Sequence, residues 1–268
     1  MEAENILSKN KVAIIVPIYK NELTDFEIRS IKILKQYLSS YTIYAVGPKS
    51  ISRKYHKFNF LEFDSNYFKN IPSYSKLLLS SQFYERFENY KYVLIYQIDC
   101  LIFSSGLEKW CELGYDYIGA PFFRNKYNPM SGFSRVGNGG LSLRKVESFL
   151  KVLNSEKIPS WLQFIKNPLP DRPFWDVKKR ISVLRQVQNG IKWYSNQYSL
   201  NEDLFWSDRA KLFYPDFKVA PIDIGLKFAF EAYPRYCYEK NNYKLPFGAH
   251  AWEKWDKTFW DEKLFEKN

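Results

Sequence analysis

An apolar run interrupted by a single carboxylate constrains the fold of this chain more than any other feature. The segment Val93–Phe103 reads Val-Leu-Ile-Tyr-Gln-Ile-Asp-Cys-Leu-Ile-Phe, which predicts a strand covered on both faces. An ionised Asp99 within such a strand is costly unless another group pairs with it. Open α/β sheets bind ligands beyond the carboxyl ends of their strands, where an aspartate can hold a divalent cation and the cation a diphosphate. The alternative is a strand-end aspartate that only caps the following turn.

Length and composition limit the class of protein. A chain of 268 residues with 46% hydrophobic residues predicts one large α/β domain over 1–268 and excludes a disordered chain. A formal net charge of +11 favours phosphorylated ligands, an anionic membrane surface or nucleic acid, without choosing among them.

Cysteine usage and hydropathy give an expectation about location. Cys100, Cys111 and Cys237 lack the spacing of a metal site or a disulfide scaffold, which predicts a reducing, cytoplasmic setting. The segment 1–11 is polar and carries no apolar signal core, and no stretch approaches the roughly 18 apolar residues of a membrane span. We therefore expect a cytoplasmic protein that is soluble or peripheral at the inner face of the membrane.

The order of the expected elements indicates the architecture. Strands are expected at Val12–Tyr19, Thr42–Val46, Phe58–Phe63 and Val93–Phe103, with helices from Thr24 or Asp25 to about Leu38 and from Pro72 to about Phe87. Further along, Tyr115–Phe122 predicts a strand, Leu141–Leu143 the end of another, and Lys145–Leu153 a helix. Such β-α-β-β-α-β order predicts a Rossmann-like three-layer α/β sandwich with a central, mostly parallel sheet.

Between residues 155 and 196 the pattern weakens. Basic residues alternate with aromatic ones from Trp161 to Trp193, which predicts either a solvated helical insertion with buried rings or an acceptor-side subregion. In the second interpretation this basic, aromatic face attracts acidic acceptors or an anionic membrane surface.

Three glycines lie close together in the segment Val136–Arg144. Gly137, Gly139 and Gly140 allow the backbone to approach a ligand closely or to adopt a positive φ, although a β-bulge or a tight hairpin would use them equally well. No Lys-Ser or Lys-Thr pair follows them, so the segment is not a phosphate loop.

Two later segments carry titratable groups. Glu202 and Asp203 precede an apolar run, which is typical of a helix N-terminus and also suits a general base at the wall of a site. His250 lies in the Gly- and aromatic-rich segment Pro246–Trp252, where it is either a structural histidine or a ligand.

The end of the first strand offers groups for a nucleotide. Tyr19 suits stacking on a base, and Lys20 suits a phosphate. Lys76, near the start of the helix expected from Pro72, suits a phosphate in the same way, because helix N-termini attract anions.

Taken in order, these segments resemble a GT-A glycosyltransferase, and especially a bacterial family of unknown function related to those enzymes. The resemblance spans about Val12 to Trp252. It implies a GT-A-like fold, a nucleotide-diphosphate sugar donor, a glycan or lipid-linked acceptor, and Mn²⁺ or Mg²⁺ at a DxD-type motif, here Gln97-Ile98-Asp99, in which Gln97 replaces the first aspartate. Together with Lys20 and Lys76, which the residues themselves suggest for phosphates, the candidate site residues are Pro17, Tyr19, Lys20, Lys76, Gln97 and Asp99 for the nucleotide sugar, Asn138, Gly139 and Gly140 for the acceptor, Asp99 and His250 for the metal, and Asp203, then Glu202, for catalysis.

The chemistry of sugar transfer explains why such groups belong together. The leaving diphosphate gains negative charge, which a divalent cation and cationic side chains stabilise, while a carboxylate takes the proton of the acceptor hydroxyl. A carboxylate on the face opposite the leaving group gives single displacement with inversion.

Three other functions remain open from the sequence. A nucleotidyltransferase acting on a sugar phosphate shares the sheet order, although the segment Pro17–Glu22 lacks the expected glycines. A nucleotide- or sugar-binding relative without activity is suggested by Gln97. A nucleic-acid-binding module agrees with the charge but matches no recognised motif, so no nucleic acid partner is expected.

Overall fold

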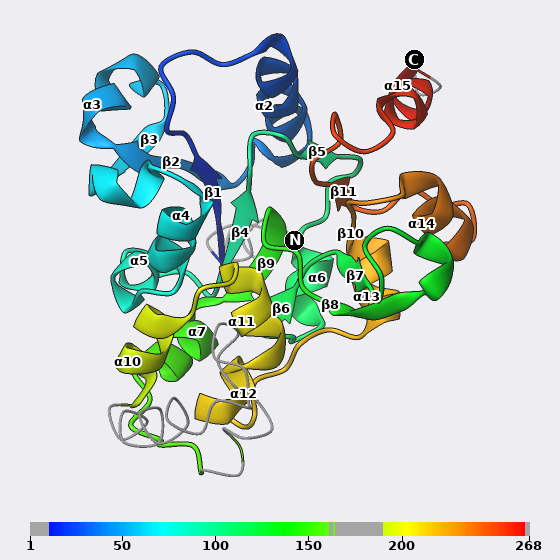
Figure 1. Cartoon of the computed structure of the whole chain (residues 1–268). Coiled ribbons are helices and arrows are strands. Elements are labelled where there is room, and N and C mark those ends of the chain that lie inside the picture. The colour runs from blue at the N-terminus through cyan, green and yellow to red at the C-terminus, as the bar shows by residue number, and fades with distance from the viewer. Residues whose placement is uncertain (1–10, 161–162, 164–189, 266–268) are drawn as a thin grey trace, which may run out of the picture.

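The computed structural model describes residues 11–160, 163 and 190–265. Its centre is a six-stranded sheet with the order β3-β2-β1-β4-β9-β6 (Figure 1). The first four of these strands run parallel, and β9 is antiparallel to both β4 and β6. The strands are β1 (Val12–Pro17), β2 (Thr42–Pro48), β3 (Asn59–Phe63), β4 (Tyr92–Tyr96), β6 (Tyr117–Ile118) and β9 (Leu141–Lys145). The expected α/β class with a central, mostly parallel sheet is confirmed.

The strand β1 shows why the sheet is covered on both faces. All of its residues are buried. Alternate side chains enter different cores, Ala13 and Ile15 on one face and Ile14 and Val16 on the other. The continuous apolar run expected of a central parallel strand is therefore divided between two layers.

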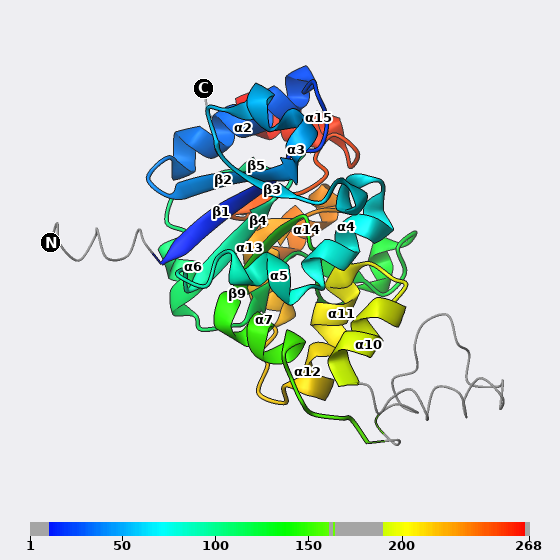
Figure 2. The same ribbon diagram turned by 90° about the vertical axis from the view of Figure 1, so that its left-hand side faces the viewer.

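Helices cover the two faces of this sheet (Figure 2). On one face lies α2 (Asp25–Leu38), which begins at a capping box in which Thr24 and Glu27 satisfy each other's backbone N–H groups. On the other face the core also includes residues of α4 (Ile71–Leu78), α5 (Ser81–Glu85), α7 (Val146–Leu153), α10 (Gly190–Gln197), α11 (Glu202–Asp208) and α12 (Ala210–Phe213). The remaining helices are α3 (Lys49–Ser52), α6 (Glu108–Glu112), α13 (Ile222–Phe228), α14 (Pro234–Lys240) and α15 (Lys257–Phe265), with short 3₁₀ turns η1 (Arg53–Tyr55), η2 (Ser65–Phe68) and η3 (Pro129–Ser131).

Two small sheets stand beside the main one. Strands β10 (Ala229–Phe230), β11 (Gly248–Ala249) and β5 (Leu101–Ile102) form the first, and the hairpin of β7 (Pro121–Phe123) and β8 (Phe133–Val136) forms the second. A third core lies under the first small sheet and joins it to the C-terminal helix through Leu101, Trp252 and Trp260.

Three elements expected to be continuous are broken. The expected strand Val93–Phe103 leaves the main sheet after Tyr96, turns at Gln97–Cys100 and continues as β5 in the small sheet. The helix expected from Pro72 to about Phe87 is interrupted between α4 and α5, where the N–H of Ser80 bonds the carbonyl of Leu77. The expected strand Tyr115–Phe122 is divided between β6 and β7, because Gly119 passes close to the backbone carbonyls of Gly137 and Asn138. Apolar residues resume soon after each break, so the apolar pattern did not reveal the breaks.

Part of the subregion expected at 155–196 lies outside the described residues. This holds for Trp161, Trp175 and the basic residues from Lys166 to Arg185, whereas Trp193 belongs to α10. Among the described residues, no helix is long and apolar enough to cross a membrane.

Candidate functional site

The site forms where the chain leaves the main sheet at the end of β4. The turn is closed by the N–H of Cys100 bonding the carbonyl of Gln97 at 2.9 Å, and the N–H of Gln97 bonds the carbonyl of Gly140 at 2.9 Å. Within this turn Asp99 has a partly exposed side chain. The predicted position of Asp99 just beyond the carboxyl end of a buried strand agrees with the structure.

His250 faces this turn from the small sheet. Its backbone N–H bonds the carbonyl of Phe230, which fixes the residue just beyond β11. Its Nε2 lies 3.0 Å from Oε1 of Gln97 and 3.5 Å from Oδ1 of Asp99. Three residues of the predicted site, two from the turn after β4 and one 153 positions from Gln97, thus meet at one point.

Gly140 is a glycine because the imidazole occupies the space of its side chain. A Cβ at this position would lie 2.1 Å from Nε2 of His250. The glycine-rich segment was expected to let the backbone approach a ligand closely. At Gly140 the group that lies against the backbone is the side chain of His250, another residue of the predicted site.

Sequence reasoning missed Glu231, which follows β10 directly. Its Oε1 lies 3.4 Å from Nδ1 of His250, and its Oε2 accepts a hydrogen bond from Nδ2 of Asn138. The missed signal is the one that singled out Asp99, namely a carboxylate at the end of an apolar run, here Phe228-Ala229-Phe230.

The two carboxylates flanking His250 set its charge. Burial acts to lower the pKa of His250, but Asp99 and Glu231 outweigh it and raise the pKa to about 10. Burial likewise acts to raise the pKa of Asp99, and the neighbouring His250 more than reverses this, so that the pKa of Asp99 is lowered. The imidazole therefore lies, as a cation, between two carboxylates.

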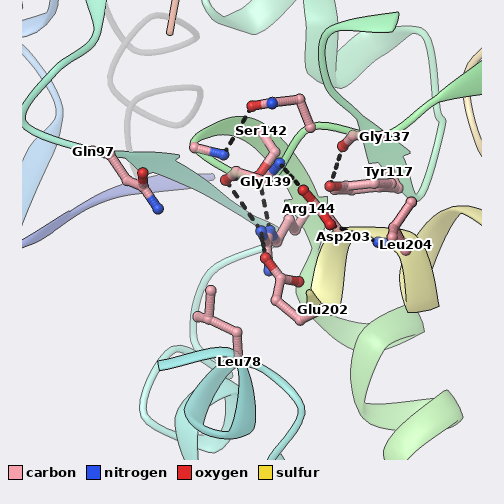
Figure 3. Close-up of polar contacts among 12 residues, drawn as sticks. Leu78, Gln97, Tyr117, Gly137, Gly139, Ser142, Arg144, Glu202, Asp203 and Leu204 are labelled. Atoms are coloured by element: carbon pink, nitrogen blue, oxygen red, sulfur yellow. Dashed lines mark hydrogen bonds and ion pairs between the residues drawn. The ribbon is translucent and has the colours of Figure 1, made fainter. Parts of the chain in front are cut away.

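Asp203 reaches the same region from the start of α11 (Figure 3). Its Oδ2 accepts a hydrogen bond from the N–H of Gly139 at 3.2 Å, and its Oδ1 accepts one from Leu204 at 2.7 Å. Burial raises the pKa of Asp203 and the charge of Glu231 adds to it, although both hydrogen bonds oppose the rise. A carboxylate with a raised pKa beside a glycine-rich strand suits a general base.

Glu202, the adjacent carboxylate, points elsewhere. Arg144 on β9 donates to both of its oxygens, at 3.0 Å and 2.8 Å, and also to the hydroxyl of Tyr84 and the carbonyl of Gly139. The pair is buried, with Arg144 0% exposed. Burial opposes the charge of Arg144, but Glu202 outweighs it and raises the pKa of the guanidinium. Glu202 therefore anchors α11 to β9. The burial of Arg144 was not predicted from the sequence.

The exit of β1 places two of the predicted nucleotide-binding residues near the turn. Pro17 ends β1, and beyond it Tyr19 is 52% exposed with its ring stacked 6.3 Å from that of Phe68. Lys20 pairs with Glu27 at 2.5 Å, and its charge contributes to lowering the pKa of Asp99. An exposed ring and a cation at this edge suit a base and a phosphate.

Lys76 is placed differently from the expectation. Its Nζ donates to the main-chain carbonyls of Ser195, Asn196 and Tyr198 at 2.6–2.9 Å, at the C-terminal end of α10. It also lines a pocket of about 520 Å³ between α4 and α10 whose lining does not include Asp99 or His250. The structure thus assigns Lys76 to holding a helix end.

The donor atoms at the turn fit a divalent cation whose remaining coordination positions are filled by a bound ligand. The carboxylate of Asp99 and the amide oxygen of Gln97 are oxygen donors of the kind that Mn²⁺ accepts, and Nε2 of His250 would join them once the metal displaces its proton, because only a neutral imidazole ligates a metal. Glu231 lies at the other ring nitrogen, so it does not share that point. In the part of the chain that is described, no three His, Cys, Asp or Glu residues form a metal-holding group. Such a site depends on ligand phosphates, as magnesium sites in phosphate-transferring proteins do.

Comparison with solved structures finds similar folds among glycosyltransferases. Mouse xyloside xylosyltransferase 1 has a TM-score of 0.45 and 12% identity, over 89% of this chain and 97% of that one. An active-site mutant of LgtC has the same score and identity over 89% and 86%, and the mannosyltransferase Ktr4p from S. cerevisiae has 0.42 and 12% over 73% and 67%.

The chain belongs to the family described as DUF5672, protein of unknown function, whose profile matches residues 57–250. That range includes Asp99, Asn138, Asp203 and His250 and excludes the exit of β1. Curated protein sequences give no match.

Proposed function

We propose that this chain is a glycosyltransferase that moves a sugar from a nucleotide-diphosphate donor to a glycan or lipid-linked glycan acceptor, with inversion and with the help of Mn²⁺ or Mg²⁺. The proposal includes a role in bacterial surface polysaccharide or glycoconjugate synthesis, on the cytoplasmic side of the membrane.

One observation carries the proposal: groups from four separate segments meet at the carboxyl edge of the main sheet. Gln97 and Asp99 come from the turn after β4, Asn138 and Gly139 from the connection between β8 and β9, Asp203 from α11, and His250 from just beyond β11 of the small sheet. This edge is where open α/β sheets bind their ligands.

The residues divide the reaction between two ends of the site. Asp99, Gln97 and His250 would hold the cation, which supplies positive charge to the leaving diphosphate. Tyr19 offers a ring for the base, and Lys20 a charge for the phosphates.

At the other end, Asp203 takes the proton of the acceptor hydroxyl as that oxygen attacks the anomeric carbon. Asn138, Gly139 and Gly140 border this position and provide the surface on which the acceptor lies. Glu202 is not the base, because it is buried in an ion pair with Arg144; it holds α11, and with it Asp203, against β9. A single displacement by an acceptor on the face opposite the leaving group inverts the anomeric centre.

A thermal-shift panel of nucleotide diphosphates and nucleotide sugars, with and without Mn²⁺, tests the donor side. We expect a shift with a nucleotide diphosphate that requires Mn²⁺ and disappears in Asp99→Asn. An unchanged shift in that variant would remove Asp99 from the site.

The product distinguishes the remaining functions. Transfer to an acceptor, with the anomeric configuration of the product read by NMR, supports the proposal and its stereochemistry. Release of pyrophosphate from a nucleoside triphosphate and a sugar phosphate indicates a nucleotidyltransferase instead, and binding without turnover of any donor indicates a non-catalytic relative.

A further inference from the structure

The tip of the β7–β8 hairpin exposes apolar side chains to an unusual degree. Tyr127 is 78% exposed and Met130 76%, the highest values among the exposed large hydrophobic residues of the described chain. Both belong to one turn, and Figure 1 shows the hairpin on the side of the molecule away from α3. Two such side chains on one projecting turn form an apolar tip with nothing of the described chain covering it.

The tip of this hairpin is basic and carries no acid of its own, whereas Arg135 on β8 pairs with Asp208 of α11. No Asp or Glu occurs from Tyr117 to Lys145. Arg124 and Lys126 are exposed, and no ion pair joins either of them to a carboxylate among the described residues. The ammonium of Lys126 lies 4.7 Å from the ring centroid of Tyr127, so cation and ring form one surface.

The backbone of the tip is satisfied from within. Asn125 accepts from the N–H of Tyr127 at 2.9 Å, and Asn128 accepts from that of Met130 at 3.0 Å. The hydroxyl of Ser131 donates to the carbonyl of Asn128 and accepts from the N–H of Asn125. These bonds pair most of the turn's amides internally, which lowers the cost of moving the tip out of water into a lipid interface.

Aromatic packing fixes the base of the hairpin. Phe123 packs on Phe133 with ring centroids 4.8 Å apart and on Tyr233 at 5.3 Å. The hydroxyl of Tyr233 also donates to the carbonyl of Lys126. The tip is therefore held in place, so it presents Tyr127 and Met130 together rather than as separate mobile side chains.

We propose that this tip, residues 124–130, docks the protein on an anionic phospholipid surface. Cations and projecting apolar side chains on a convex turn match a charged headgroup layer over an apolar interior. A folded partner would instead need a groove or a flat face to enclose these side chains. The inference goes beyond the transferase proposal and does not depend on it. Because β8 leads directly to Asn138, docking brings the candidate acceptor strand close to the lipid.

Vesicle co-sedimentation of the whole chain tests the docking, with no nucleotide, sugar or metal present. We expect binding to phosphatidylcholine vesicles containing phosphatidylglycerol and not to pure phosphatidylcholine. Lys126→Ala removes one charge at the surface and should weaken binding about fivefold. Tyr127→Ser combined with Met130→Ser should weaken it about tenfold.

Matched substitutions elsewhere separate this surface from overall charge and hydrophobicity. Lys54→Ala lowers the net charge equally but lies in η1, and Tyr243→Ser removes another exposed ring, so both should bind like the wild type. Circular dichroism must show that all variants remain folded. Equal binding to neutral vesicles, no binding by the wild type, or equal losses in Lys54→Ala and Lys126→Ala would overturn the proposal. Equally strong binding to a soluble acidic polysaccharide would also overturn it.

Discussion

Removing the guanidinium of Arg144 tests whether the buried pair holds α11 in place. Arg144 is fully buried and donates to both oxygens of Glu202, at 2.8 Å and 3.0 Å. The substitution Arg144→Met keeps a long apolar stem but leaves a carboxylate buried without a partner. Breaking such a pair from one side costs about 3–5 kcal/mol, a large part of the roughly 5–15 kcal/mol that stabilises an ordinary domain.

Urea unfolding followed by tryptophan fluorescence measures this loss, since Trp206 lies on the same helix and is buried. The double variant Arg144→Met with Glu202→Met removes both charges and should recover most of the stability. Arg235→Met is the matched control, because its side chain is 54% exposed and pairs with Asp256 and Glu262 at the surface. That substitution should cost no more than about 1 kcal/mol.

The loss in Arg144→Met should also depend on pH. Burial raises the pKa of Glu202 to about 7 although Arg144 opposes the rise, so removing Arg144 leaves the folded pKa still further above the roughly 4.3 of an unfolded chain. Its contribution to stability is then fully present below that value and is lost as the pH rises through the folded pKa. The reasoning is refuted if Arg144→Met unfolds within 1 kcal/mol of the wild type, or if the double variant is no more stable than the single one.

Two further predictions concern the site itself. Asp203→Asn should abolish turnover while leaving the affinity for the nucleotide sugar unchanged, because only the transition state loses an interaction; a fall in affinity as large as the fall in kcat would contradict the role of base. Burial raises the pKa of Asp203, and a general base acts in its ionised form. The wild-type rate should therefore rise with pH through a midpoint above the roughly 3.9 of a free aspartate, and a midpoint at or below that value would contradict the role of Asp203 as base. Gly140→Ala places a Cβ 2.1 Å from Nε2 of His250, so the Mn²⁺-dependent thermal shift with a nucleotide diphosphate should disappear although the protein stays folded. Retention of the full shift would show that the imidazole ring of His250 is not needed at that position.

The sequence was most informative at residues whose expected position in the fold required a particular neighbouring group. Asp99 stood out because a carboxylate in a buried strand needs a partner, and the structure provides His250. The glycine-rich segment likewise predicted a close approach, which occurs at Gly140. In both cases a property of the residue itself, the charge of Asp99 or the missing side chain of Gly140, predicted that another group lies close by.

What the sequence could not predict depends on contacts between distant segments. Gln97 and Asp99 interrupt the apolar run at this point, but Ile98, Cys100 and Leu101 around them also fit a continuous strand, so the sequence did not show that the chain changes sheet there. Arg144 looked like an ordinary polar residue at the end of a strand, since its burial depends on Glu202, 58 positions away. Glu231 remained unnoticed because β10, the strand before it, has only two residues.

The passage of one segment through two sheets has a consequence for the energetics of the whole protein. Asp203 and Gly139 belong to the body built on the large sheet, whereas His250 and Glu231 belong to the small sheet over the core of Trp252 and Trp260. A ligand held between Asp99 and His250 would connect these two parts of the protein. Its binding energy would appear as added resistance of the C-terminal part to local unfolding, measurable as slower amide exchange in α15. Destabilising α15 would in turn lower the affinity for the ligand, although no atom that contacts the ligand changes.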